Sequence, residues 1–168
     1  ISGPITILDK DGGILTGESA VLTRDFKEGV IRGARYIIEG QLQVAATEMN
    51  RVDGRYNQLY KAVASSCQVC AKHEIPLWRI RARRIVHDQE EKQIYYDDAF
   101  FEVAGVPILY FPRLRTPDPT LNRATGFLVP LVRNSSTLGN GVKFPYFITL
   151  GDHADITLTP YVSGKTTT

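Results

Sequence analysis

Residues 78–103, WRIRARRIVHDQEEKQIYYDDAFFEV, decide the fold class of this chain. Apolar and polar side chains alternate on both sides of an acidic stretch, Asp88-Gln89-Glu90-Glu91. Alternation of this kind is typical of a half-buried β-strand, and two such runs around a short polar turn predict a β-hairpin.

The same pattern recurs towards the N-terminus. Two further acidic or glycine-bearing turns are expected at residues 25–29 and 52–54, and an Asp-Lys-Asp-Gly-Gly turn at residues 9–13. The hairpin units start near Leu15, Leu42 and Trp78. Their spacing is irregular, so we expect a degenerate series of hairpins and an all-β fold rather than a regular solenoid.

Residues 37–49 allow a second interpretation, because they contain the helix formers Glu, Gln and Ala. The apolar side chains of Leu42, Val44 and Ala46 fit a period of two at least as well as a period of 3.6. We therefore predict a strand here.

The composition is typical of a soluble globular protein. Of 168 residues, 43% are hydrophobic and 23% are charged, and the net charge is +2, which gives no support for binding nucleic acid. No apolar run approaches the roughly 20 residues of a membrane helix. The chain starts at Ile1 without a signal-peptide pattern, so we expect it to be a processed piece of a longer protein.

The character of the sequence changes at Pro112. Four prolines between residues 112 and 130 predict an extended connector, because proline fixes φ and cannot donate to a β-ladder. Beyond it, residues 143–165 hold two aromatic-bearing alternating stretches around Gly151-Asp152-His153. Each is about as long as the ~10-residue strand of an outer-membrane barrel.

Four pieces of sequence carry a resemblance to a known family. They are GVPILYFP at residues 105–112, GFLVP at 126–130, PYF at 145–147 and DITLTP at 155–160. In this order and spacing they resemble the LptD family of lipopolysaccharide-assembly proteins, also called organic solvent tolerance proteins. The hairpins nearer the N-terminus resemble the weaker OstA-like repeat.

The resemblance implies an architecture in three parts. Residues 1–111 would be the C-terminal part of an OstA-like antiparallel β-jellyroll on the periplasmic side. Residues 112–130 would be the connector, and residues 131–168 the first strands of a truncated transmembrane β-barrel.

The same resemblance implies lipopolysaccharide transport and assembly at the cell outer membrane, with acyl chains shielded inside the jellyroll and passed to the barrel. It further implies bridge proteins of the periplasm as partners by strand-edge pairing, and a plug lipoprotein in the full-length protein. An alternative from another class is a structural module that docks by its strand edges without binding lipid. An unpaired edge would also allow strand-mediated homo-oligomers.

The two cysteines, Cys67 and Cys70, leave several interpretations open. Zinc would need further ligands, and His73, His87 and His153 show no paired metal spacing. A redox catalyst would need a helix after the motif, and none is indicated. We expect no metal, and the oxidising periplasm that the resemblance implies favours a disulfide. In the family a cysteine at the position of Cys67 pairs with the distant barrel. Two unpaired thiols are the competing interpretation.

The sequence gives no sign of catalysis. It holds no glycine-rich phosphate loop, no G-x-S-x-G and no H-E-x-x-H, and no cofactor is expected. Asp97 and Asp98 are adjacent in a strand and are expected to point to opposite faces. The arginines of residues 79–84 would bind lipid phosphates, or lie on a solvated strand face with Ile80 and Ala82 inward; we favour the second interpretation.

The remaining candidate site is apolar. Nine side chains are expected to face the jellyroll interior and to contact acyl chains, although a filled β-sandwich core would show the same alternation. They are Val44, Ala46, Trp78, Ile80, Ala82, Ile94, Tyr96, Phe101 and Val103.

Overall fold

The computed structural model confirms the all-β prediction. It describes residues 2–9, 12–38, 40–66, 76–121, 123–128, 130–136, 139–151 and 153–164. The chain divides into two compact units, Ile1–Thr120 and Leu121–Thr168. Within the described ranges every regular element is a strand, and no helix there could cross a membrane.

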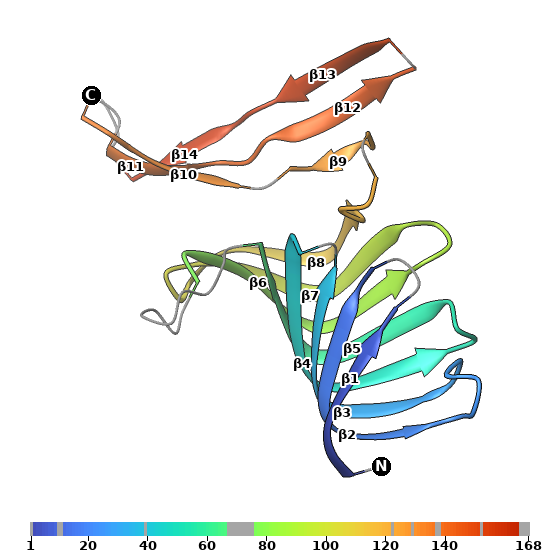
Figure 1. Cartoon of the computed structure of the whole chain (residues 1–168). Coiled ribbons are helices and arrows are strands. Elements are labelled where there is room, and N and C mark those ends of the chain that lie inside the picture. The colour runs from blue at the N-terminus through green and yellow to red at the C-terminus, as the bar shows by residue number, and fades with distance from the viewer. Residues whose placement is uncertain are drawn as a thin grey trace. The chain divides into compact units, whose positions relative to one another are not determined.

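Unit 1 contains eight strands and unit 2 contains six (Figure 1). Those of unit 1 are β1 (Ser2–Leu8), β2 (Ile14–Leu22), β3 (Gly29–Ile38), β4 (Leu42–Val52), β5 (Tyr56–Ser65), β6 (Trp78–Asp88), β7 (Gln93–Val103) and β8 (Val106–Pro117). Those of unit 2 are β9 (Gly126–Phe127), β10 (Leu131–Ser135), β11 (Gly139–Lys143), β12 (Tyr146–Leu150), β13 (Ala154–Leu158) and β14 (Tyr161–Ser163).

The strands of unit 1 form one antiparallel sheet in sequence order, β1 to β8. The turns predicted at residues 25–29, 52–54 and 88–91 connect β2 to β3, β4 to β5 and β6 to β7. The predicted strand within residues 37–49 is confirmed for β4, which begins at Leu42. This single antiparallel sheet agrees with the expected jellyroll.

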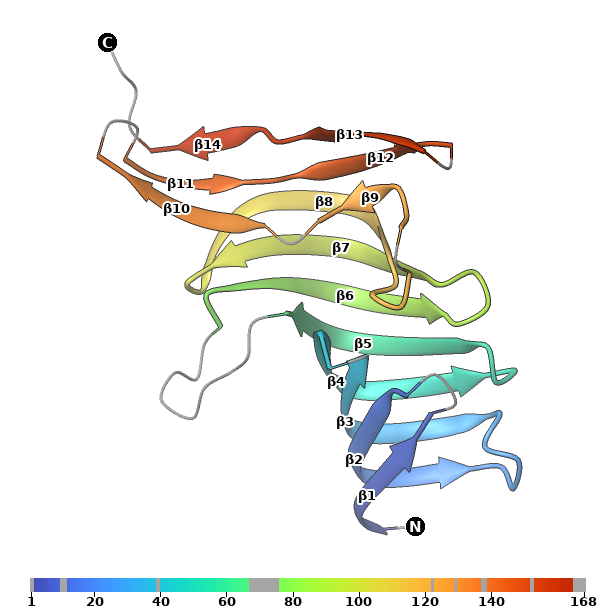
Figure 2. The same ribbon diagram turned by 45° about the horizontal axis from the view of Figure 1, so that its top comes forward.

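Backbone hydrogen bonds join these turns to one another. The N–H of Gly54 donates to the carbonyl of Lys27 at 2.8 Å, and the N–H of Gln89 donates to the carbonyl of Arg55 at 3.1 Å. The N–H of Asp118 extends the series to the carbonyl of Lys92 at 2.9 Å. The turns therefore form a continuous rim along one border of the sheet, which Figure 2 shows beside the strands.

A crease crosses the middle of the sheet. In each strand from β3 to β8, cross-strand pairing is interrupted at one position. The pairing continues in register on both sides of that position. These positions are Gly33, Thr47, Lys61, Arg83, Asp98 and Pro112. Gly33, Lys61 and Asp98 have left-handed φ angles of 60°, 48° and 49°. Such angles bend a strand, and the aligned bends fold the sheet into two arms (Figure 1).

The crease also keeps both arms facing one core. On either side of it, consecutive buried side chains lie three residues apart instead of two, as in Leu59 and Ala62, or Tyr96 and Ala99. We call the arm that runs to the rim of turns the first arm, and the other the second arm. If the side chains alternated strictly along the whole strand, without this three-residue spacing, the apolar side chains of one arm would point to solvent.

Alanines occupy the inner side of the crease. Five of them lie opposite one another across five strands, and each is at most 8% exposed. They are Ala34, Ala46, Ala62, Ala82 and Ala99. The arms approach most closely at this inner corner, where only a small side chain fits. Larger apolar side chains pack on either side, such as Ile85 in the first arm and Val44 in the second.

The last strand of unit 1 extends further than the sequence pattern indicated. β8 ends at Pro117, so residues 112–117 of the expected connector belong to the sheet. β8 is an edge strand, and proline is tolerated at an edge because one row of its backbone groups has no partner strand.

Unit 2 consists of two three-stranded sheets, ordered β10-β11-β14 and β13-β12-β9. Large apolar side chains are exposed on both sheets. They include Leu131, Val132, Leu150, Ile156, Leu158 and Val162.

Candidate functional site

The structure places all nine predicted interior side chains on the inner face of the sheet of unit 1. Seven are at most 8% exposed, and Ile80 and Val103 are half-buried. The rings of Trp78 and Phe101 stack at 5.9 Å between centroids near the end of the second arm. The inner face of that arm is thus a continuous apolar surface. It includes the cross-strand row Leu15, Tyr36, Val44, Ala64, Ile80 and Phe101.

The arginines of β6 face outward, as the favoured interpretation predicted. Glu102, which is 3% exposed at its side chain, accepts hydrogen bonds from Arg79 at 2.6 Å and Arg81 at 2.7 Å. Burial raises the pKa of Glu102, but the two arginines lower it by more, so the net shift is downward. These pairs hold β6 to β7 and engage both Arg79 and Arg81 with Glu102.

The expectation for Asp97 and Asp98 was wrong. Both point outward, Asp97 to Arg84 at 2.6 Å and Asp98 to Arg83 at 2.6 Å. The left-handed φ of Asp98 interrupts the alternation, so adjacent residues share a face. Their separate arginines still keep the two carboxylates from forming one site.

Polar side chains are concentrated where the first arm approaches the rim of turns. Arg51 of β4, Asn57 of β5 and His87 of β6 are cross-strand partners on the inner face, and they are 9%, 0% and 3% exposed. The imidazole of His87 also forms a short hydrogen bond with Asp118. We call Arg51, Asn57 and His87 the polar row.

Asp9 joins the second arm to this polar end of the first. Its carboxylate accepts hydrogen bonds from Arg51 at 2.9 Å and from the Tyr36 hydroxyl at 3.3 Å, and a further one from Gln89. The side chains of Arg51 and Asp9 are only 9% and 7% exposed. Burial, followed by the charge of Asp9, raises the pKa of Tyr36, which therefore stays protonated as a donor. This ion pair fastens the two arms together.

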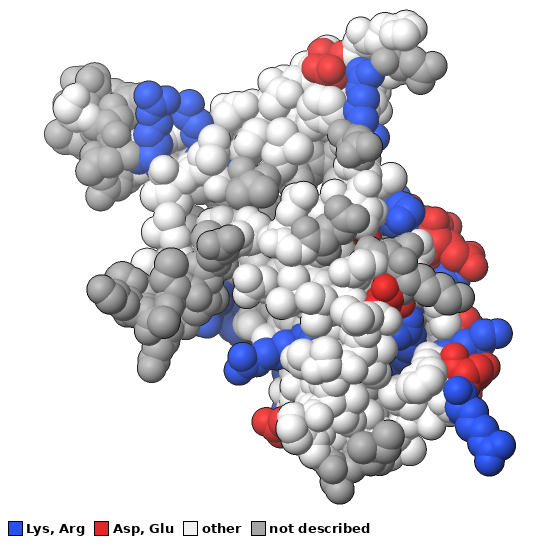
Figure 3. Space-filling model, in the orientation of Figure 1, with Lys and Arg blue, Asp and Glu red and all other residues white. Residues whose placement is uncertain are grey.

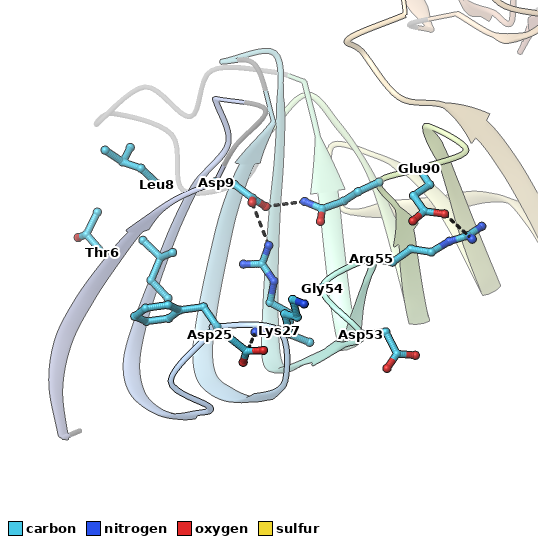
Figure 4. Close-up of a pocket in the computed structure, with 13 residues that line it drawn as sticks. Thr6, Leu8, Asp9, Asp25, Lys27, Asp53, Gly54, Arg55 and Glu90 are labelled. Carbon is cyan, nitrogen blue, oxygen red and sulfur yellow. Dashed lines mark hydrogen bonds and ion pairs between the residues drawn. The ribbon is translucent and has the colours of Figure 1, made fainter.

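A pocket of about 670 Å³ lies between β1 and the turns of the rim. Residues 6–9 line one side, residues 25–27 and 53–55 line the other, and Arg51 and Gln89 lie between them. Figure 4 shows the contacts of Asp9 and the Arg55–Glu90 pair within it. Along this border, basic and acidic side chains alternate on the surface (Figure 3).

The sequence reading missed Asp9, the polar row and this pocket. A signal existed for Asn57, because a polar residue occupies a position where the alternation of β5 calls for an apolar one. The disulfide candidates Cys67 and Cys70 lie outside the described residues.

Asp88, at the end of β6, supports a prediction about pH. Its carboxylate forms an ion pair with Arg55 at 2.7 Å and accepts hydrogen bonds from the backbone N–H groups of Glu90 and Glu91. The Arg55 hydrogen bond, and then these backbone bonds, outweigh burial and lower the pKa of Asp88. The stability that the ionised Asp88 contributes is therefore complete above the pKa of about 4 that this side chain has in the unfolded state. It disappears as the pH falls through the lower pKa of the folded state.

We expect Asp88→Asn to reduce the free energy of unfolding by about 2 kcal/mol at neutral pH, and by progressively less below about pH 4. Urea denaturation of both proteins between pH 7 and pH 3 measures this difference. A constant difference over the whole range would contradict the assigned role of the ionised carboxylate.

Comparison with known proteins finds relatives along nearly the whole chain. The LPS-assembly protein LptD of Hahella chejuensis is 30% identical over 157 residues, which cover 92% of this chain and 19% of that protein. LptD of Sodalis glossinidius is 30% identical over 72% of the chain, and LptD of Pectobacterium atrosepticum is 28% identical over 94%.

The chain spans about a fifth of the length of these relatives. No family model matches it. The relatives' shared name describes an assembly process and no catalysed reaction.

Proposed function

Because this chain is an LptD-like region, similar along about nine-tenths of its length to LPS-assembly proteins, we propose that it takes part in lipopolysaccharide assembly at the outer membrane. In this proposal the protein binds and transfers a lipid and catalyses no reaction. Unit 1 lies on the periplasmic side, where it receives the lipid.

The inner face of unit 1 shields the acyl chains in this proposal. The observation that carries it is the inner surface of the second arm, where the uncharged cross-strand row from Leu15 to Phe101 crosses six strands. Burying apolar chains against such a surface is favourable by about 25 cal/mol per Å². The charged groups of β6 and β7 lie on the opposite face.

Unit 2 contributes the first strands of a membrane barrel, residues 131–168, in the same proposal. Exposed apolar side chains on β10, β12 and β13 support it, because lipid-facing strands carry an outward apolar band. The plug lipoprotein and the periplasmic bridge proteins are the partners that this assignment calls for.

A structural module without lipid is the second candidate function. The inner side chains are packed against one another in a buried cluster, as a filled core would be. The edge strand β8 exposes Val106, Ile108 and Tyr110, and an exposed apolar edge invites pairing with a strand of another protein or a second copy.

Photo-crosslinking separates the two functions. We expect benzoylphenylalanine at Ile80 or Tyr96 to capture lipopolysaccharide from micelles several times more than the same probe at Arg81, because only the first two face the interior. Tyr96 suits the probe because the probe retains its ring. Equal capture at the inner positions and at Arg81 would favour the lipid-free module.

A further inference from the structure

The crease gives unit 1 the form of a hinge. From β3 to β8, one residue in each strand leaves the cross-strand pairing, while the ladders on either side stay intact. The inner corner is filled by small side chains such as Ala62 and Ala99, each 0% exposed. Hinges confine a change of angle to a few backbone positions between rigid parts. The aligned crease positions are where a change in the angle between the arms would be absorbed.

A polar clasp lies opposite the crease, where the outer ends of the two arms meet; we call this side the mouth. Asp9 follows β1 at the end of the second arm. Its carboxylate accepts hydrogen bonds from Arg51 of the first arm at 2.9 Å and from Gln89 of the rim (Figure 4). We call Asp9, Arg51 and Gln89 the clasp. The arms are thus joined by the crease on one side and by these side chains on the other.

The pocket beside β1 lies directly outside the clasp. All three clasp residues line it, whereas Tyr36, which donates to Asp9 at 3.3 Å, belongs to the buried apolar cluster. The clasp is therefore the boundary between the pocket and the interior. Leu8 and Phe26 line the pocket from β1 and from the facing turn, and they are 76% and 54% exposed. They offer apolar contacts immediately outside the mouth.

The chemistry of the clasp suits a contact that opens. A buried ion pair is seldom more stabilising than an apolar contact of the same size. When the contact separates, however, the two charges regain their hydration, whereas separated apolar groups are exposed to water at a cost. Among the described residues, Nε of Arg51 is buried without a hydrogen-bond partner, and in an open mouth water would supply one.

An apolar chain between the arms would offset the remaining cost of opening. The inner side chains of the two arms pack in one buried cluster. A chain that replaced some of these contacts would restore burial of the same kind. An acyl chain has no group that could replace the hydrogen bonds of Asp9. The clasp is therefore the part of the contact between the arms that such a chain cannot restore.

We propose that the clasp is a gate: when Asp9 and Arg51 separate, the arms open about the crease and connect the pocket to the apolar interior. As an entry for acyl chains, the gate rests on the proposed function and adds where a chain enters and what holds the entry closed. As a movement of the arms, it rests on the hinge and the clasp alone.

Thiol labelling of Leu15→Cys tests the gate, in the whole chain with Cys67 and Cys70 replaced by serine. Leu15 is buried in the second arm opposite Tyr36, so a reagent reaches it through an open mouth. We expect Asp9→Asn to raise the labelling rate about tenfold or more, because the amide lacks the charge that holds the arginine. The rate should change little in dilute urea, since opening exposes little new surface.

Ala99→Cys is the control for unfolding. Ala99 lies at the inner corner of the crease, which stays covered when the mouth opens. Its labelling requires unfolding of the sheet, so it should be much slower and rise steeply with urea. Asp97→Asn removes a carboxylate from an arginine on the outer face, and should change the labelling of Leu15→Cys by no more than about twofold. Equal rates with equal urea dependence at the two thiols would overturn the gate, because Asp9 would then only stabilise the fold.

Myristate separates the gate from the proposed function. At about ten times its dissociation constant, it should slow the labelling of Leu15→Cys in the Asp9→Asn chain about tenfold, because it fills the space behind the mouth. Labelling of Ala45→Cys on the outer face should be unchanged. Fast labelling of Leu15→Cys without protection by myristate would support the gate and contradict the shielding of acyl chains, so the two proposals fail separately.

Discussion

Asp9→Ala is expected to lower the free energy of unfolding by about 3–5 kcal/mol, the usual effect of removing one partner of a buried ion pair. Arg51 would keep its charge at a position only 9% exposed, without the carboxylate that now lies 2.9 Å away. The Tyr36 hydroxyl and the Gln89 amide would lose the same acceptor. Because Asp9 belongs to the second arm and Arg51 to the first, the loss weakens the contact between the arms. Urea denaturation of the variant and the unchanged protein measures this loss of unfolding free energy.

A matched control removes another carboxylate from an arginine in the same pocket. Glu90 lies 2.6 Å from Arg55, but its side chain is 68% exposed, so Glu90→Ala should cost no more than about 1 kcal/mol. The double variant Asp9→Leu/Arg51→Leu should recover most of the stability, because it leaves no buried charge unpaired. Equal costs for Asp9→Ala and Glu90→Ala would contradict the role given to Asp9.

The hairpins of unit 1 could be predicted because their signals are local. Asp53 and Gly54 have left-handed φ angles, which suit the turn between β4 and β5, and the flanking side chains alternate over many residues. In β6 the alternation also identified Ile80 and Ala82 as inward-facing without knowledge of the partner strands. Turn chemistry and a period of two need only a few neighbouring residues to be recognised.

The crease could not be predicted in the same way. Continuing the alternation from Ala82 assigns Arg84 and Val86 to the interior, whereas the structure buries Ile85 and His87. The change of phase occurs where six strands bend together, so its cause lies in contacts between strands. Asp9 and Arg51 are likewise 42 positions apart, and nothing in either neighbourhood indicates the other.

The alanines at the crease show what this shared bend requires of the sequence. Ala62 is 0% exposed and lies between Ala46 and Ala82 on the neighbouring strands. Interiors are packed as densely as organic crystals, so additional atoms displace their neighbours. At the inner corner those neighbours belong to both arms. A larger side chain there would force the arms apart and disturb the packing on each of them.

We therefore expect Ala62→Leu to destabilise unit 1 by about 3 kcal/mol, the upper part of the range for overpacked cores. Ala45→Leu is the control, because Ala45 is only partly buried and lies on the outer face in the row of Arg35 and Arg81. It should change the free energy of unfolding by no more than about 0.5 kcal/mol. Urea denaturation of both variants makes the comparison. Similar, small effects at the two positions would show that the arms have room at the crease, and that the alanine row does not set how closely they approach.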